Sequence, residues 1–314
     1  MKGIIVDGHC DSLNEAYKQK KDLDDINLMF NIKMARKPYL QFLATFINDE
    51  ILKDNINNGY RYGNNVINYF YNQYNILKEK YNLEIIKSKN DLENIDKDTL
   101  GILLSTENGG IIGNDKENIV RLYKKGIRVM GITWNNDNLL GCGALTKKDT
   151  GLTDFGKECI KVMNELGIIV DVSHTSYNTF YDIINISKKV LATHSNVYNI
   201  KNHPRNLSDN QICEIAKLDG IIGICLCKDF LGDNNVTIYD IVKHIDYIVN
   251  LVGINHVAIG TDFDGVEKED LPTSINNVKD IYKIKDALKE NSYDDESIYK
   301  IMGGNYIRYL KDNI

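Results

Sequence analysis

Apolar runs of four to eight residues alternate along the chain with segments of helical periodicity. Eight runs indicate strands: 3–8, 40–47, 100–106, 127–134, 168–173, 190–193, 221–227 and 257–261. Short continuous apolar runs are typical of strands buried on both faces, and strands that alternate with helices form parallel sheets with crossover helices. The pattern therefore predicts an α/β fold with eight strands, the number found in a (β/α)8 barrel.

Two of the segments between these runs show the helical pattern most clearly. Apolar residues recur every three or four positions between Thr153 and Gly167, and again between Thr237 and Gly253. Threonine is a favoured N-cap, and glycine commonly follows the last helical residue because it adopts a left-handed backbone without strain. Both segments are therefore predicted to be crossover helices with defined ends.

Two regions depart from strict alternation. Residues 64–81 predict a long tyrosine-rich helix, and LEIIKSK at 83–89 predicts an extra short strand. Two further helices, expected at 276–290 and 294–310, would pack on the outside of the barrel and offer a surface for a homodimer contact. No repeat or linker divides the 314 residues, so we expect one domain, residues 1–314.

Several apolar runs end in residues that bind metal ions: His9, Asp11, Glu107, His174, His194 and Asp262. The carboxyl ends of the strands in a (β/α)8 barrel open onto one face and direct their last side chains toward a shared centre. His9 and Asp11 are two residues apart, which places both side chains on one side of an extended segment. The spacing therefore predicts a metal site at the barrel mouth.

The types of these residues indicate hydrolytic chemistry. Histidines with carboxylates form a nitrogen and oxygen ligand set that suits zinc, with manganese or another divalent ion as a substitute. Glu107 is the candidate able to bridge two ions, since its carboxylate has two oxygens. Two metals about 3.5–4 Å apart would share Glu107 and a water whose pKa falls far enough to supply hydroxide. Asp262 is placed to accept a proton and pass it to a leaving amine.

Composition and charge exclude several classes of protein. A net charge of −6 and a pI near 5.6 argue against a nucleic-acid-binding surface, which needs a basic excess on one face. No apolar run approaches the length of a membrane span, and charges interrupt the start of the chain, where a secretory signal needs an apolar stretch. The six cysteines therefore indicate reduced thiols in a cytoplasmic protein, with Cys225 and Cys227 as buried strand residues.

A family resemblance is carried by five blocks of sequence: DGHCDS, STENGG, GLTDFGKECIKVMNELGIIVDVSH, THSNVYNIKNHPRNLSD and AIGTDFDGV. They resemble the corresponding blocks of the membrane (renal) dipeptidase family, peptidase family M19, a branch of the metal-dependent amidohydrolase-like barrels whose members cleave dipeptides. The match runs in order from about residue 3 to residue 266, and its specificity comes from the combination of blocks.

The resemblance implies a (β/α)8 TIM barrel with two zinc ions. The implied ligands are His9, Asp11 and Glu107 for the first ion, and Glu107, His174 and His194 for the second. Asp262 matches the catalytic aspartate of the family, and Arg205 matches an arginine that binds the substrate carboxylate. A planar guanidinium that grips a carboxylate with two hydrogen bonds suits the end of a dipeptide.

One segment departs from the family pattern. Mammalian members carry a histidine in a T-H-N segment at the end of the fourth strand, which helps to bind the substrate or its oxyanion, whereas this chain has Thr133, Trp134 and Asn135. Alternation predicts that Trp134 and Asn135 face opposite ways, so that only one reaches the site. We favour Asn135 as the oxyanion donor, with Trp134 as a wall of the substrate pocket.

Other polar residues near these blocks have less specific expectations. His203 is a candidate for substrate contact, because it lies two residues before Arg205. Asp264 is expected to cap or turn the loop after the last strand. Asp7 and Asp171, each just before a predicted ligand, are candidates for orienting a histidine.

Three functions follow from the sequence. The first is a zinc-dependent dipeptidase, for which the resemblance also suggests tolerance of a C-terminal D-residue. The second is a related metal amidohydrolase that acts on an N-acyl amino acid or a lactam, distinguished by whether the pocket recognises a free α-amine. The third is a non-catalytic binding protein on the same barrel, which would be expected to have lost ligands.

Overall fold

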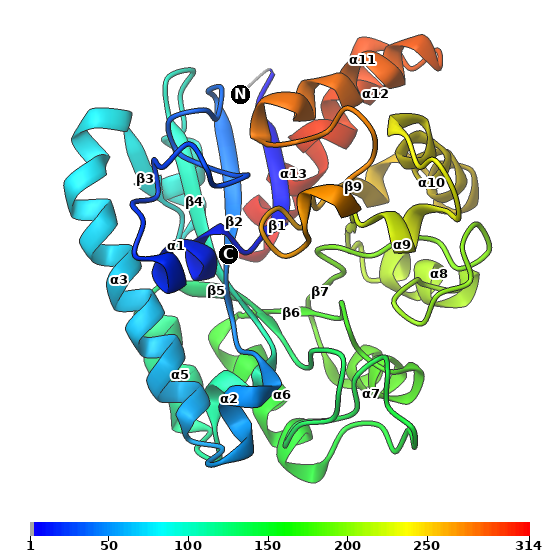
Figure 1. Ribbon diagram of the computed structural model, residues 1–314. Coiled ribbons are helices and arrows are strands. Elements are labelled where there is room, and N and C mark those ends of the chain that lie inside the picture. Colours follow the sequence, from blue (N-terminus) through cyan, green and yellow to red (C-terminus); the bar gives the residue numbers. More distant parts are fainter. Residues whose placement is uncertain (1–2) are drawn as a thin grey trace.

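The computed structural model describes residues 3–314, and a parallel sheet lies at its centre. Its eight main strands are β1 (Ile5–Cys10), β2 (Tyr39–Phe46), β4 (Leu100–Glu107), β5 (Ile127–Gly131), β6 (Ile169–Asp171), β7 (Val190–Leu191), β8 (Ile222–Ile224) and β9 (Val257–Ile259). They pair in the order β7-β6-β5-β4-β2-β1-β9-β8, and a parallel bridge between Ala192 and Ile222 brings the two end strands together. The strands form a nearly closed barrel, which confirms the predicted (β/α)8 class (Figure 1).

Helices surround the barrel. The longer ones are α1 (Ser12–Gln19), α3 (Asn58–Tyr81), α5 (Glu117–Lys124), α6 (Asp154–Leu166), α7 (Tyr177–Ile186), α8 (Asp209–Lys217), α10 (Ile238–Val252), α11 (Tyr282–Glu290) and α13 (Asn305–Asn313). Shorter ones are α2 (Asp49–Lys53), α4 (Lys89–Glu93), α9 (Lys228–Leu231) and α12 (Asp295–Tyr299). The two predicted crossover helices are α6 and α10, and Thr153 and Thr237 cap them as expected.

The additional elements between β2 and β4 are also present. The tyrosine-rich segment forms α3, which begins six residues before the predicted start, at Asn58 instead of 64. Strand β3 (Leu83–Ile85) pairs in parallel with the first residues of β4, so that the extra strand expected in 83–89 is confirmed.

Most strands are shorter than the apolar runs that predicted them. Strand β5 ends at Gly131, three residues before the predicted end at 134, and β8 covers only 222–224 of the run 221–227. Ile132 and Thr133 nevertheless remain fully buried. The apolar runs thus extend past the strand ends because the segments that follow the strands at the barrel mouth are also buried.

Alternation along β4 shows how a strand directs a side chain into the mouth. Ile102 and Leu104 pack in the large cluster between the strands and the helices, whereas Leu103 belongs to the smaller cluster inside the barrel. Side chains two or four residues apart on a strand share a face. Glu107, the last residue of β4, therefore faces the same side as Leu103 and lies at the carboxyl end of the barrel.

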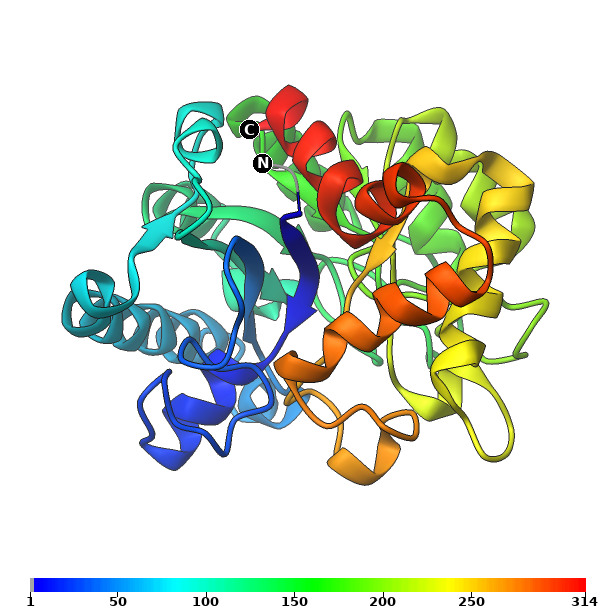
Figure 2. The same ribbon diagram turned by 90° about the horizontal axis from the view of Figure 1, so that it is seen from above.

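The C-terminal helices only partly follow the prediction that they pack outside the barrel. Ile284 of α11 and Ile298 of α12 pack in the outer cluster, but Tyr306 of α13 packs in the inner one, with its ring 5.1 Å from that of Phe42. Helix α13 lies beside β1 and covers the amino-terminal end of the barrel (Figure 2). Gly8 leaves room for this residue, since a Cβ there would lie 2.1 Å from the Tyr306 hydroxyl oxygen. An open barrel end needs apolar side chains to fill it, which explains the inward position of Tyr306.

Two other sequence expectations concern the whole chain. Within residues 3–314, no helix is both long and apolar enough to cross a membrane. Cysteines 10, 142, 159, 213, 225 and 227 are all free thiols. Cys225 and Cys227 are buried as expected, but they are not strand residues, because β8 ends at Ile224.

Candidate metal centre

The polar residues that end the apolar runs converge around Glu107. Its two carboxylate oxygens face different histidines: Oε2 lies 2.9 Å from His9 Nε2, and Oε1 lies 2.9 Å from His174 Nε2. Glu107 is only 6% exposed, so these contacts are shielded from bulk water. Residues from β1, β4 and the segment after β6 are thereby brought to one point, as the strand-end pattern predicts.

We call His9, Asp11 and Asp262 the carboxylate half of this cluster. His9 Nε2 lies 3.5 Å from Asp11 Oδ2 and 3.8 Å from Asp262 Oδ1. The other oxygen of Asp11, Oδ1, is buried and has no hydrogen-bond partner in the structure. A buried carboxylate oxygen without a donor is costly unless a cation occupies the space in front of it.

We call His174 and His194 the imidazole half. Their Nε2 atoms lie 2.8 Å apart, and each can offer one ligand atom together with Glu107. Both side chains are buried, at 7% and 0% exposure. Three potential ligands on one side of the Glu107 carboxylate and two on the other make an arrangement that can hold two neighbouring cations.

The electrostatics of the cluster also favour a cation. Burial, followed by the nearby charge of Glu107, raises the pKa of Asp11 to about 7. Burial, followed by the charge of Arg205, lowers the pKa of His174 to about 4, so that its imidazole is neutral, as a metal ligand must be. Three buried carboxylates and the neutral imidazoles of His174 and His194 make a donor set that fits divalent ions.

Two residues of the cluster have an unusual backbone. His174 has φ 67° and Asp262 has φ 63°, both in the left-handed region that residues other than glycine rarely adopt. Such strain persists only where the surrounding structure holds it, and it is concentrated at functional sites.

Gly265 supports the same corner of the site and was not identified from the sequence. A Cβ at this position would lie 2.3 Å from Asp262 Oδ1 and 2.5 Å from Asp11 Oδ2. Any larger residue would therefore displace both carboxylates, and the only sequence signal was a glycine after the DFD segment.

Cys225 also lies closer to the chemistry than its apolar run suggested. Its Sγ donates to Asp262 Oδ2 at 3.6 Å. Burial raises the pKa of this thiol well above its usual value, so the group is a neutral donor beside the carboxylate.

Arg205 reaches the cluster from the loop after β7. It is 4% exposed, its Nη2 donates to the backbone oxygen of His194 at 3.1 Å, and its Nε has no partner in the structure. Its guanidinium lies 5.4 Å from the centre of the Phe230 ring. An arginine buried with unsatisfied donors beside a metal-binding cluster is suited to receive an anionic group.

Trp134 and Asn135 both lie against His174. Asn135 Oδ1 is 2.9 Å from His174 Nδ1, and the Trp134 ring is 6.4 Å from the His174 ring and 5.1 Å from the Phe46 ring. The expectation that these neighbours face opposite ways fails because β5 ends at Gly131, so that the pleat does not continue to them. The roles given to them from the sequence stay predictions.

The remaining polar candidates have mainly structural contacts. Asp264 accepts hydrogen bonds from the backbone of Met29 at 3.0 Å and of Phe30 at 3.3 Å, and so holds the loop before β2. Asp7 accepts from the backbone N–H of His9 at 3.3 Å, whereas His203 Nδ1 accepts from the backbone N–H of Arg205 at 3.2 Å. Asp7 and His203 therefore act on the backbone near the site through these contacts.

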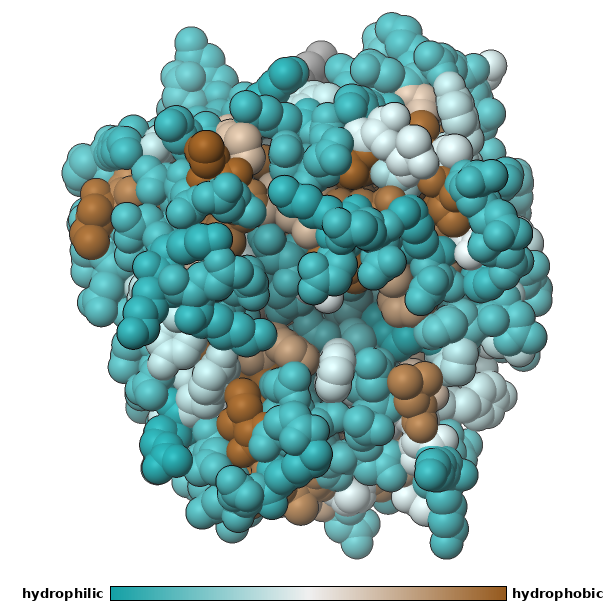
Figure 3. Space-filling view, viewed as in Figure 1, coloured by the Kyte–Doolittle hydropathy of each residue, from teal (hydrophilic) through white to brown (hydrophobic). Residues whose placement is uncertain are grey.

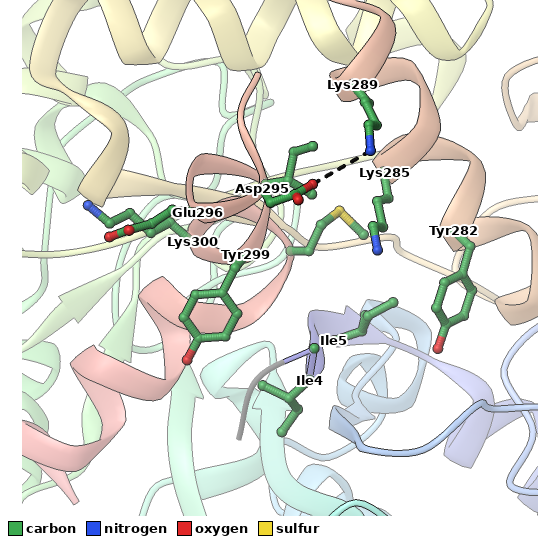
Figure 4. Close-up of a pocket in the computed structure, with 12 residues that line it drawn as sticks. Ile4, Ile5, Tyr282, Lys285, Lys289, Asp295, Glu296, Tyr299 and Lys300 are labelled. Carbon is green, nitrogen blue, oxygen red and sulfur yellow. Dashed lines mark ion pairs between the residues drawn. The ribbon is translucent and has the colours of Figure 1, made fainter. Parts of the chain in front are cut away.

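The molecular surface is hollowed near the centre of one face, and the hollow is lined by hydrophilic residues (Figure 3). A separate cavity of about 870 Å³ lies at the opposite end of the barrel, at the start of β1. Ile4, Ile5, Tyr282 and Lys285 line it, and Lys289 pairs with Asp295 at 3.7 Å on its rim (Figure 4). None of the residues of the metal cluster lines this cavity.

The chain is similar to a known protein family and to curated proteins. The sequence model of the family described as Membrane dipeptidase (Peptidase family M19) matches residues 1–313. An uncharacterized protein in the pqqA 5′ region of Klebsiella pneumoniae is 32% identical over 243 residues, covering 73% of this chain and 89% of that protein. An uncharacterized dipeptidase of Schizosaccharomyces pombe is 32% identical over 201 residues, covering 60% of this chain and 47% of that protein.

Solved structures share the fold. A metallo peptidase from Rhodobacter sphaeroides, liganded with a phosphinate mimic of the dipeptide L-Ala-D-Ala, has a TM-score of 0.87 at 20% identity and covers 99% of each chain. The probable dipeptidase PvdM from Pseudomonas aeruginosa has a TM-score of 0.88 at 18% identity, covering 98% of this chain and 94% of that one. At these identities the likeness concerns the fold alone.

Proposed function

Because the chain belongs to the membrane dipeptidase family, peptidase family M19, and is thus a metal-dependent hydrolase of peptide bonds, we propose that it cleaves dipeptides with two divalent ions, preferably zinc. One observation carries the proposal. Both oxygens of the buried Glu107 carboxylate face histidine nitrogens at 2.9 Å, so this residue can serve two ions at once. His9 and Asp11 would hold one ion, and His174 and His194 the other.

The reaction divides between the ions and the chain. Divalent ions held by these ligands would polarise the substrate carbonyl and lower the pKa of a water molecule, so that hydroxide is available near neutral pH. Asp262 takes the proton of the attacking water and returns it to the leaving amine. Burial raises the pKa of Asp262, which brings this carboxyl group closer to the range in which it can both accept and release a proton. Cys225 supports this role by donating to Oδ2 and leaving Oδ1 open toward His9.

Arg205 binds the C-terminal carboxylate of the substrate. Its buried guanidinium has an unpartnered Nε–H, and its own charge has no carboxylate partner among the ion pairs of residues 3–314. In the strand order, β7, which precedes Arg205, lies across the barrel from β2, which ends at Phe46. The N-terminal residue of a dipeptide anchored at Arg205 would therefore lie toward Phe46 and Trp134, which form an apolar wall.

A dipeptidase also needs to exclude longer substrates. An arginine that holds the carboxylate one residue beyond the scissile bond leaves no place for a further residue on the C-terminal side. On the N-terminal side, the wall formed by Phe46 and Trp134 would have to close the pocket after one residue. The L-Ala-D-Ala mimic bound by the Rhodobacter sphaeroides relative supports tolerance of a C-terminal D-residue in this chain.

A panel of substrates on metal-reconstituted protein tests the proposal. We expect hydrolysis of L-Ala-L-Ala and L-Ala-D-Ala, and little hydrolysis of tetrapeptides. Fast cleavage of N-acetylated amino acids or lactams, without cleavage of free dipeptides, would instead favour the related amidohydrolase activity. If the metallated protein hydrolyses none of these substrates, the proposal is contradicted.

The role of Arg205 has its own test. Arg205→Ala, or amidation of the dipeptide carboxyl group, should lower kcat/KM about a hundredfold, since a charge-assisted contact is lost. The two defects should not add, because they remove the same contact. Arg121→Ala is the matched control, since Arg121 pairs with Asp115 on the surface. Additive losses would show that Arg205 acts elsewhere.

A further inference from the structure

The nitrogens of His174 and His194 that face away from Glu107 have hydrogen-bond partners. His174 Nδ1 lies 2.9 Å from Asn135 Oδ1, and His194 Nδ1 lies 2.9 Å from Thr193 Oγ1. In a neutral imidazole one nitrogen carries a hydrogen and the other a lone pair, and the partner of one nitrogen decides which.

The partner of His174 accepts hydrogen bonds and cannot donate them. The oxygen of a side-chain amide has lone pairs and no hydrogen. His174 Nδ1 carries a hydrogen when it bonds Asn135 Oδ1, and in a neutral imidazole this leaves the lone pair on Nε2. Nε2 lies 2.9 Å from Glu107 Oε1, which also only accepts, so Glu107 competes for the same hydrogen until a cation lies between the two atoms.

Thr193 also places the hydrogen of His194 on Nδ1, but this depends on a further residue, Asp171. Asp171 accepts backbone hydrogen bonds from Ser173 at 2.9 Å and from Thr193 at 3.0 Å, and it also accepts the Thr193 hydroxyl hydrogen. The hydroxyl has only one hydrogen, so once Oγ1 has donated it to Asp171 it can only accept from His194 Nδ1. The lone pair of His194 is thereby placed on Nε2.

In the tautomers that Asn135 and Thr193 favour, the two lone pairs face one another across 2.8 Å, and neither nitrogen has a hydrogen to donate to the other. Such a contact is unfavourable in an empty site and favourable around a cation. We propose that Asn135 and the Asp171–Thr193 pair are positioning residues that fix the tautomers of both histidines and so prepare the imidazole half for a divalent metal. This inference rests on the proposed metal-dependent function.

The two devices differ in burial, which allows separate tests. Asp171 and Thr193 are 4% and 1% exposed, whereas Asn135 is partly exposed in the mouth segment. Asn135→Leu keeps the approximate size and removes the acceptor, while Asn135→Asp keeps an acceptor oxygen. Thr193→Val keeps the shape and removes the hydroxyl.

Zinc affinity, measured by competition with a chelator, is the main readout. We expect Asn135→Leu and Thr193→Val to weaken binding of the second ion about 10–100-fold, and Asn135→Asp to stay within a few-fold of wild type. The matched controls are Asn136→Leu, whose amide bonds Asp49 on the surface, and Thr45→Val, whose buried hydroxyl has no partner in the structure. Wild-type affinity in both Asn135→Leu and Thr193→Val would overturn the inference.

Nitrogen-15 NMR of the metal-free protein gives a second readout that does not depend on binding. The spectrum should show His194 with hydrogen on Nδ1. Asn135→Leu should shift the hydrogen of His174 from Nδ1 toward Nε2, because Glu107 is then its remaining acceptor, and should leave the signal of His194 unchanged. A hydrogen on Nε2 of wild-type His194, or a His174 signal that Asn135→Leu leaves unchanged, would overturn the inference even if zinc binds. If wild-type protein has these tautomers but binds no divalent metal, the proposed function fails and the tautomer assignment stands.

Discussion

The carboxylate half and the imidazole half of the metal centre are stabilised by different means. In the first, Asp11 and Asp262 bring buried negative charge close to Glu107, and an oxygen of Asp11 has no partner in the structure. In the second, neutral histidines are held by hydrogen bonds from behind. One half thus depends on a cation to offset its charges, whereas the other is arranged by the protein before a cation arrives.

The two halves also differ in ligand chemistry. Carboxylate oxygens bind hard ions such as manganese, while imidazole nitrogens favour zinc and similar transition-metal ions. Glu107 belongs to both halves, since each of its oxygens faces one of them. We therefore expect the largest effect from a substitution at Glu107, a smaller one from a substitution within the carboxylate half, and the smallest from a substitution beside the imidazole half.

The largest effect is expected from Glu107→Gln. A neutral amide cannot bridge two ions as a carboxylate does, so metal content should fall below two ions per chain and kcat/KM should drop about a thousandfold. Elemental analysis of the purified variant and dipeptide hydrolysis check this. A fully metallated and fully active Glu107→Gln protein would rule out a shared carboxylate.

Removal of the metal should have the next largest effect, on stability. A ligand that binds only the folded protein adds about 2.7 kcal/mol at a hundred times its dissociation constant. Thermal unfolding of chelator-treated protein should therefore begin several degrees lower and recover when zinc is returned. Glu107→Gln serves as the control and should respond less to zinc; an equal response would mean that the stabilising ion binds elsewhere.

A smaller and opposite effect is expected from Asp11→Asn in the metal-free protein. The substitution removes one of three crowded carboxylates, so the metal-free variant should be more stable than metal-free wild type by about 1–2 kcal/mol at pH 8. Zinc should then stabilise the variant less than wild type. Denaturant unfolding with and without zinc measures both effects. A metal-free Asp11→Asn protein that is less stable than wild type would show that the charges do not repel in the folded state.

The smallest effect is expected beside the imidazole half, from Trp134→Phe. The Trp134 ring lies near the rings of both Phe46 and His174, so a smaller aromatic ring should change the preference for the N-terminal side chain of the substrate a few-fold. Metal content should stay at the wild-type level. Ratios of kcat/KM across a dipeptide panel measure the change. If Trp134→Phe instead lowers kcat alike for every dipeptide, the indole N–H is the oxyanion donor that Asn135 was expected to be.

Sequence reasoning reached the fold and the candidate ligands because both depend on local patterns. His9 lies in β1 and Asp11 directly follows its last residue, so a spacing of two residues was enough to predict that both lie at the same strand end. Glu107, His174, His194 and Asp262 each follow an apolar run, and parallel strands bring such ends together whatever the intervening loops contain.

Only the tertiary structure decided how these residues are supported. Asn135 meets His174 across 39 positions of sequence, and Cys225 meets Asp262 across 37. Tyr306 enters the barrel from a helix that sequence periodicity placed outside it. Periodicity reports which face of an element is apolar, and strand ends report where polar groups gather. Neither determines which side chain contacts which, because that depends on where strands stop and how distant segments pack against one another.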